Sequence, residues 1–116
     1  MQHLEDLDEA ALMVVFGGSR ELAGQLAVLF LDDIDPRMKE INAAVTVRDA
    51  VRLRAGAHAL GGSAATMTAK SVSTAAATLE AMGRSGLLDG VQRALEDLNL
   101  ALELLRPRLV ALTGAA

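Results

Sequence analysis

Residues 88–112 read LDGVQRALEDLNLALELLRPRLVAL, the most regular stretch of the 116-residue sequence. Leucine or valine recurs in it at alternating steps of three and four residues, at Leu88, Val91, Leu95, Leu98, Leu102, Leu105, Leu109 and Leu112. This spacing places the apolar side chains on one face of a long α-helix that packs against other helices. We predict Asp89 as the N-cap of this helix and a kink near its end at Pro107.

Two helices are predicted before residue 47. The first is short, ends at Gly17 and Gly18, and has an apolar face made of Leu4, Leu7, Ala11 and Val14. The second begins at the N-cap Ser19, and its apolar face consists of Leu22, Leu26, Leu29 or Phe30, Ile34, Met38, Ile41 and Val45. Because a proline interrupts helical hydrogen bonding, we expect Pro36 to bend or briefly break this helix at Asp35.

A third and a fourth helix follow in the middle of the chain. The third lies between Thr46 or Val47 and Thr68, with an apolar face of Ala50, Leu53, Ala57, Leu60, Ala64 and Met67. The fourth is predicted to begin at Ser71 as N-cap and to end at Gly83 or Gly86, with an apolar face of Val72, Ala75, Ala76, Leu79 and Met82. The pattern predicts an all-α fold, an antiparallel four-helix bundle with a short additional N-terminal helix, as a single domain over residues 1–116.

The composition excludes several classes of function. Without cysteine the chain has no disulfide, thiolate metal site or cysteine nucleophile. A net charge of −4 and an aromatic content of two Phe argue against binding of nucleic acid. The acidic N-terminal stretch is unlike a signal peptide, and no run approaches the ~18 uncharged residues of a membrane span. We therefore expect a cytoplasmic protein that contacts neither nucleic acid nor membrane.

His58 is the candidate functional residue. Projection of the third helix at about 100° per residue places His58 beside the apolar face, on a ridge with Val51, Arg54, Gly61, Gly62 and Ala65. Each glycine inside a helix costs roughly 1 kcal/mol relative to alanine. Gly61 and Gly62 therefore indicate that open space beside the imidazole has a use.

Two ordinary explanations compete with this interpretation. A lone helical histidine is most often a surface residue without a chemical role. Glycines also let two helices approach closely, which accounts for Gly56, Gly61 and Gly62 without any ligand. The explanations are compatible, because Gly56 can serve packing while Gly61 and Gly62 face outwards.

The sequence around the histidine resembles a known family. Residues 57–65 read AHALGGSAA, and Leu79-Glu80 and Arg84-Ser85-Gly86 follow. This pattern is similar to the signature of histidine-containing phosphotransfer (HPt) domains of bacterial multistep phosphorelays. In that family an Ala-His-x-Leu-Lys-Gly-Ser/Ala core in one bundle helix precedes a Leu-Glu pair in the next. The resemblance extends upstream to Phe16-Gly17-Gly18 and Pro36, and so covers nearly the whole chain.

The resemblance implies a phosphocarrier and not an autonomous kinase. In the family a solvent-exposed histidine takes a phosphoryl group from a phospho-aspartate of one receiver domain and passes it to an aspartate of another, and His58 is the matching residue. The implied partners are receiver domains of a hybrid histidine kinase and of a response regulator. These receivers carry the Mg²⁺, so no cofactor or metal is expected on this chain. We expect a monomer whose docking surface around the histidine includes Val51, Ala55, Gly61, Gly62 and Ala65.

Two residues depart from the family pattern. The usual Lys three residues after the histidine is Gly61, and the usual Gly before Ala69 is Thr68. In the family that Lys commonly lies near the phosphoryl group and offsets its charge, so its loss bears on the stability of the phosphohistidine or on the rate of transfer, and another cation could replace it. Arg54 lies one turn before the histidine, and Arg84 or Lys70 is a second candidate. Glu80 matches a family residue, but the sequence does not indicate what it contacts.

Two other functions remain open at this point. The loss of the Lys leaves room for an adaptor or receiver-binding protein that has kept the fold with weak or no phosphotransfer. A plain helical oligomerisation module is the other alternative, in which the leucine faces form an interface between chains instead of a core.

Overall fold

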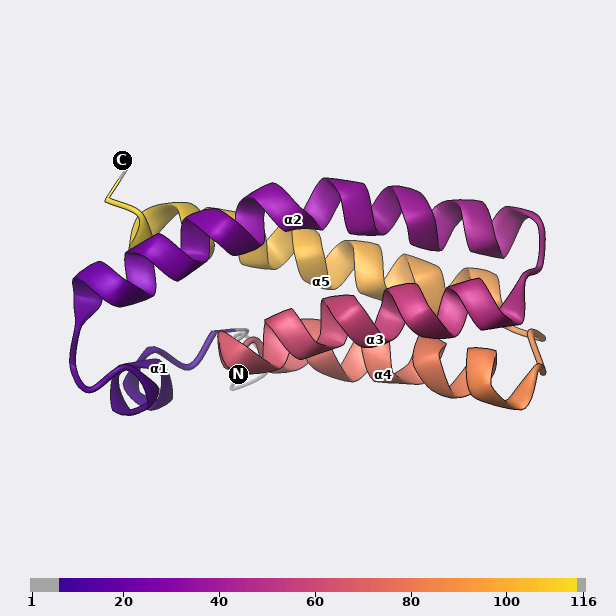
Figure 1. Cartoon of the computed structure of the whole chain (residues 1–116), viewed down its shortest axis with the longest axis horizontal. Helices are drawn as coiled ribbons and strands as arrows, with labels where there is room; N and C mark the ends of the chain where they lie inside the picture. The colour runs from indigo at the N-terminus through magenta and orange to yellow at the C-terminus, as the bar shows by residue number, and fades with distance from the viewer. Residues whose placement is uncertain (1–6, 115–116) are drawn as a thin grey trace.

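The computed structural model describes residues 7–114 and folds them into five α-helices without a β-strand in that range. The helices are α1 (Glu9–Val15), α2 (Arg20–Thr46), α3 (Ala50–Thr66), α4 (Lys70–Ser85) and α5 (Val91–Leu112). Figure 1 shows α2 to α5 running alternately up and down as a bundle, with α1 placed at one end. The predicted fold class is confirmed.

A sharp turn separates α1 from α2. Gly17 and Gly18 both take positive φ angles, +62° and +83°, which side chains other than glycine rarely adopt. Ser19 then caps α2 as predicted, since its side chain accepts a hydrogen bond from the backbone N–H of Leu22. No single helix within residues 7–114 is long and apolar enough to cross a membrane; α1 and α2 meet that criterion only together, with a bend of 105° between them.

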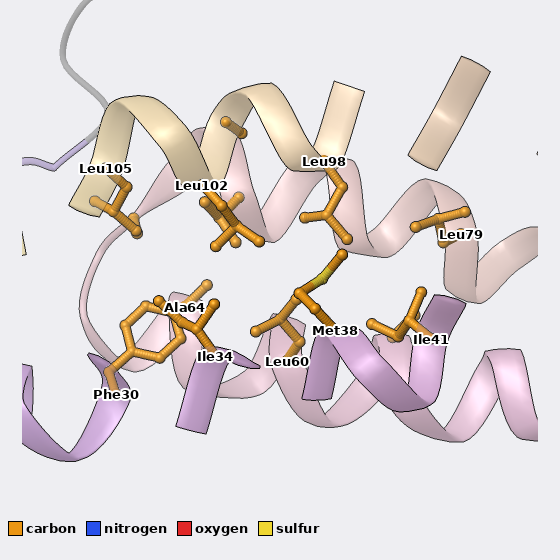
Figure 2. Packing of buried hydrophobic residues seen from close by; sticks show 14 of the residues in the cluster. Phe30, Ile34, Met38, Ile41, Leu60, Ala64, Leu79, Leu98, Leu102 and Leu105 are labelled. Atoms are coloured by element: carbon orange, nitrogen blue, oxygen red, sulfur yellow. The ribbon is translucent and has the colours of Figure 1, made fainter. Parts of the chain in front are cut away.

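The apolar faces of the four long helices meet in one core. Figure 2 shows side chains of α2, α3, α4 and α5 pointing toward one another between the helices. The large side chains that are completely buried include Leu53, Leu60, Leu79, Leu98 and Leu105. The leucine faces are therefore the core of the chain, and the hypothesis that they form an interface between chains is wrong.

The predicted buried residues are less accurate in α1 and in the first half of α2 than in the rest of the bundle. In α2 the alternative Phe30 is the buried residue, whereas Leu29 faces outwards. In α1 the predicted Val14 is 81% exposed, because the short helix turns Leu12 toward the bundle instead. Leu4 lies outside the described residues. A seven-residue helix makes too few turns for spacing alone to fix which face is buried.

Two predicted caps are wrong because neighbouring residues adopt left-handed backbone conformations. Helix α4 starts before Ser71, with Ala69 at the N-cap, since Thr68 reverses the chain at φ +57° and its hydroxyl donates to the carbonyl of Asp8. Helix α5 starts after Asp89, since Gly90 at φ +82° occupies the N-cap position. Neither helix receives a hydrogen bond from an N-cap side chain.

The two prolines leave their helices uninterrupted. Helix α2 continues through Pro36 to Thr46 and α5 continues through Pro107 to Leu112, so the break expected at Asp35 does not occur. Both prolines are exposed, and water can satisfy the backbone carbonyl that each one frees. The residues just before them form an ion pair between the helices, with Arg106 NH2 2.7 Å from Asp35 Oδ1.

Small residues let α3 and α4 pack more extensively than any other two helices. A Cβ atom at Gly83 would lie only 2.7 Å from the carbonyl oxygen of Ala50 and from the backbone nitrogen of Arg54. Gly83 is therefore a packing residue inside α4, and the helix ends at Gly86 with φ +76°. Gly56 serves packing as well, because a Cβ there would lie 3.0 Å from the Ile41 side chain of α2.

We predict that Gly83→Ala destabilises the bundle by about 1–2 kcal/mol. The added methyl group meets backbone, which has little room to shift, and this cost exceeds the gain in helix propensity. Gly62→Ala is the matched control: a Cβ there meets nothing within 4 Å, so this variant gains up to about 1 kcal/mol. Urea unfolding of the three proteins measures both changes, and a Gly83→Ala midpoint at or above that of the parent chain contradicts the prediction.

Candidate functional site

His58 lies in the middle of α3 on the outer surface of the bundle. Its side chain is 75% exposed. Helix α3 starts at the N-cap Asp49, whose carboxylate accepts from the backbone N–H of Arg52, and it continues through both glycines without a break. The buried face of α3 holds the histidine beside the core and not inside it, as the helical projection indicates.

A shallow hollow of about 470 Å³ lies between α3 and α4 at the histidine. It is lined by Val51, Arg54, Ala55, His58, Glu80 and Arg84. The structure thus brings the two predicted arginines and two of the predicted docking residues to the imidazole. Ala65 is exposed farther along α3 and does not line the hollow.

Glu80 is the residue that sequence reasoning left without a role. Its Oε2 lies 3.0 Å from Nδ1 of His58, and its side chain is only 19% exposed. The same oxygen accepts a hydrogen bond of 3.0 Å from NH2 of Arg84, one turn later in α4. One carboxylate therefore links the histidine of α3 to the arginine of α4.

This arrangement distinguishes the two nitrogens of the imidazole. An ionised carboxylate only accepts hydrogen bonds, so the neutral ring must carry its proton on Nδ1 to bond Glu80. Nε2 then keeps a free lone pair, the electronic requirement for a nucleophile. When Nε2 forms a bond to an electrophile, the ring becomes positively charged, and the adjacent carboxylate stabilises that charge.

The two glycines after the histidine have different surroundings. A Cβ at Gly62 would meet nothing within 4 Å, so the surface beside the imidazole is open there. A Cβ at Gly61 would lie 3.3 Å from the Cβ of Ala76 in α4. The interpretation that both glycines face outwards is therefore corrected for Gly61, which is half-buried at the contact between α3 and α4.

Of the three candidate cations, two lie at the hollow beside His58 and one does not. Arg54 lines the hollow and forms no ion pair with any residue in the range 7–114. Arg84 lines it too and is bound to Glu80. Lys70 is ten residues before Glu80 in α4, roughly 15 Å along the helix, so its candidacy is wrong. Ser63 lines a different hollow, between α2 and α3.

The contact between His58 and Glu80 can be inferred from the short connection between their two helices, although not from the spacing of residues within either helix. Only residues 67–69 connect α3 to α4, so the two helices form a tight hairpin. Residues at similar distances from this turn lie opposite one another, as Gly61 and Ala76 do, and so do His58 and Glu80. A hairpin register built on that short turn points to Glu80.

No group of three or more histidine, aspartate or glutamate side chains that could hold a metal ion is found across residues 7–114. Among the residues that line the hollow at His58, Glu80 is the one carboxylate. The chemistry available there is that of one imidazole, one carboxylate and two guanidinium groups.

The fold and the site define a helical bundle that presents one hydrogen-bonded, solvent-exposed histidine. A sequence model of the Hpt domain family matches residues 25–108, and the chain belongs to this family. Membership implies a phosphotransfer-related role in two-component signalling and interaction with response-regulator receiver domains. Comparisons with curated proteins and with solved structures gave no match.

We predict that His58 carries its proton on Nδ1 in the neutral state. Long-range ¹H–¹⁵N spectra recorded at about pH 8.5, where free imidazole is neutral, should show Nδ1 as the protonated nitrogen and Nε2 as the bare one. In Glu80→Gln the ring loses its carboxylate acceptor and should shift toward the mixture of tautomers found in free histidine. Predominant Nε2 protonation in the parent protein would rule out the assigned geometry.

Proposed function

We propose that the chain is a phosphorelay carrier that accepts a phosphoryl group on Nε2 of His58 from the phospho-aspartate of one receiver domain and passes it to another. The observation that carries this proposal is the exposed imidazole with Nδ1 fixed on Glu80. An imidazole held in this way presents one nucleophilic nitrogen to solvent and to an incoming partner.

The transfer needs little chemistry from this chain. The Nε2 lone pair forms a bond to phosphorus while the bond from phosphorus to the aspartate oxygen breaks, and the carboxylate leaves with that electron pair. The positive charge formed on the ring is shared with Nδ1–H, which donates to Glu80. The reverse sequence returns the group to an aspartate. We propose that the Mg²⁺ needed for the phosphoryl oxygens comes from the receiver.

The two arginines of the hollow are the proposed phosphoryl neighbourhood. Arg54 and Arg84 line the hollow at His58, whereas Gly61, which replaces the family's usual Lys, follows the histidine in α3 and does not line it. A guanidinium can pair with two phosphoryl oxygens at once, which a lysine ammonium does less well. Their presence favours an active carrier over an adaptor that has lost the reaction.

The surface around the histidine fits a protein partner. Val51, Ala55, Gly62 and Ala65 are all exposed, and all have small or branched apolar side chains or none. With the arginines at its edge, this surface can be covered by a receiver without burying an unpaired charge at its centre. The leucine faces are buried in the core of one chain and so are not available as an interface between chains, which supports a monomer that meets its partners transiently.

We predict that a phosphorylated receiver domain of the same organism transfers phosphate to the chain. The label should be acid-labile and base-stable, as a phosphohistidine is, and should be absent from His58→Gln. His3→Gln, which removes the other of the two histidines in the sequence, is the matched control and should be labelled like the parent chain. Label that persists in His58→Gln would defeat the site assignment, and no label from any of the organism's receivers would favour the adaptor.

We predict that Gly61→Lys lengthens the half-life of the phosphohistidine by about two- to fivefold, the effect of one added partly exposed ion pair. Gly61→Gln is the control, because it brings the same Cβ against Ala76 without a charge. The measurement is the loss of label with time after removal of the donor. Equal half-lives for Gly61→Lys and Gly61→Gln would show that the existing arginines already neutralise the group.

A further inference from the structure

Arg84 is held close to the reacting ring without touching it. Its NH2 group and Nδ1 of His58 both bond the same oxygen of Glu80. The guanidinium nitrogen is therefore no farther from Nδ1 than two contacts of 3.0 Å laid end to end. A phosphoryl group on Nε2 would project from the other side of a five-membered ring, within reach of a flexible arginine that is 57% exposed.

The charges around the ring favour a change of partner when phosphate arrives. In the free protein the hollow contains one carboxylate, Glu80, and the two guanidinium groups of Arg54 and Arg84. Glu40 of α2 does not line this hollow; it lines a separate one with Arg52 and Ala55. A phosphoryl group adds about two negative charges and three acceptor oxygens, which attract an arginine more strongly than one carboxylate does.

The guanidinium has donors to spare for such an exchange. It carries five N–H donors, and only NH2 bonds Glu80. Glu80 does not need Arg84 once the ring is phosphorylated, because the ring then carries positive charge and its Nδ1–H bond to the carboxylate becomes charge-assisted. The loss of the bond from Arg84 to Glu80 is therefore offset by the stronger bond from Nδ1–H of the phosphorylated ring to Glu80.

We propose that Arg84 exchanges partners on phosphorylation: it bonds Glu80 in the free protein and the phosphoryl oxygens once His58 carries the group. Arg84 is thus a positioning residue for Glu80 in one state and the phosphoryl-binding cation in the other. This inference rests on the proposed function. It assigns the role of the missing Lys to a residue on a different helix, 23 positions after Gly61 in the sequence.

The test measures the half-life of phosphohistidine in the full chain loaded with phosphoramidate, a small-molecule donor that needs no receiver. In the decay, water attacks phosphorus, the Nε2–P bond breaks with its electron pair returning to Nε2, and the protons of the water stay on the phosphate product or pass to the solvent, so the ring is again neutral with Nδ1 protonated. Arg84→Gln should shorten the half-life about two- to fivefold. The matched control is Arg93→Gln, which removes an arginine with a similar i,i+4 acid partner, Asp97, on α5, a helix that contributes no residue to the hollow.

A double-mutant cycle separates a direct role from an indirect one. If Arg84 binds the phosphoryl group, Arg84→Gln shortens the half-life by a similar factor in a Glu80→Gln background. If it acts only through Glu80, the shortening disappears in that background, and the inference is overturned. An unchanged half-life in Arg84→Gln alone overturns it as well.

A second measurement uses the parent chain without any substitution. The side-chain NMR signals of Arg84 should move when the protein is phosphorylated, while those of Arg93 stay in place. Stationary Arg84 signals contradict the exchange. Failure of receivers to label His58 would instead refute the proposed function, since the phosphoramidate experiment does not depend on them.

Discussion

The contact of α3 with α4 at Gly83 is the constraint on which the site depends. With backbone atoms of α3 only 2.7 Å from where a side chain would begin, the two helices approach as closely as glycine permits. Glu80 lies one turn before Gly83, so the same approach brings its carboxylate to 3.0 Å from the imidazole. A larger residue at position 83 would separate the helices and lengthen that hydrogen bond. Core packing and the chemistry of the surface are thus set by a single close approach.

The number of helices and the interior of the bundle could be predicted from periodicity, because Leu95, Leu98, Leu102 and their counterparts in the other helices form one regular apolar face on each helix, and these faces are buried. Helix starts were harder. Thr68 and Gly90 take left-handed conformations that shift the first residue of α4 and α5, and a plausible capping side chain nearby, Ser71 or Asp89, does not reveal this. The turn at Thr68 also contacts a distant segment, through the bond from its hydroxyl to the carbonyl of Asp8, which spacing along the sequence does not reveal.

For the site, too, features that depend on one helix could be predicted from the sequence, and features that depend on how two helices are aligned could not. The exposed position of His58 follows from the helical projection, since it depends on one helix only. The bond to Glu80 and the engagement of Arg84 depend on how α4 is aligned against α3, which spacing within a single helix does not contain. Gly61 is the clearest example of what the sequence does not show. The sequence shows that a side chain is missing there, but only the structure shows that Ala76 of α4 lies against this position, so that helix packing also benefits from the glycine.

The hydrogen bond from Nδ1 has a consequence for the speed of encounters. An imidazole this exposed would otherwise sample several rotamers, and only some of them would aim Nε2 along the line of approach to phosphorus. Because Glu80 restricts the ring, the conformational entropy is lost when the chain folds and not when a receiver arrives. A larger fraction of collisions then begins in a reactive orientation, which suits a carrier that must meet two different partners briefly and in succession.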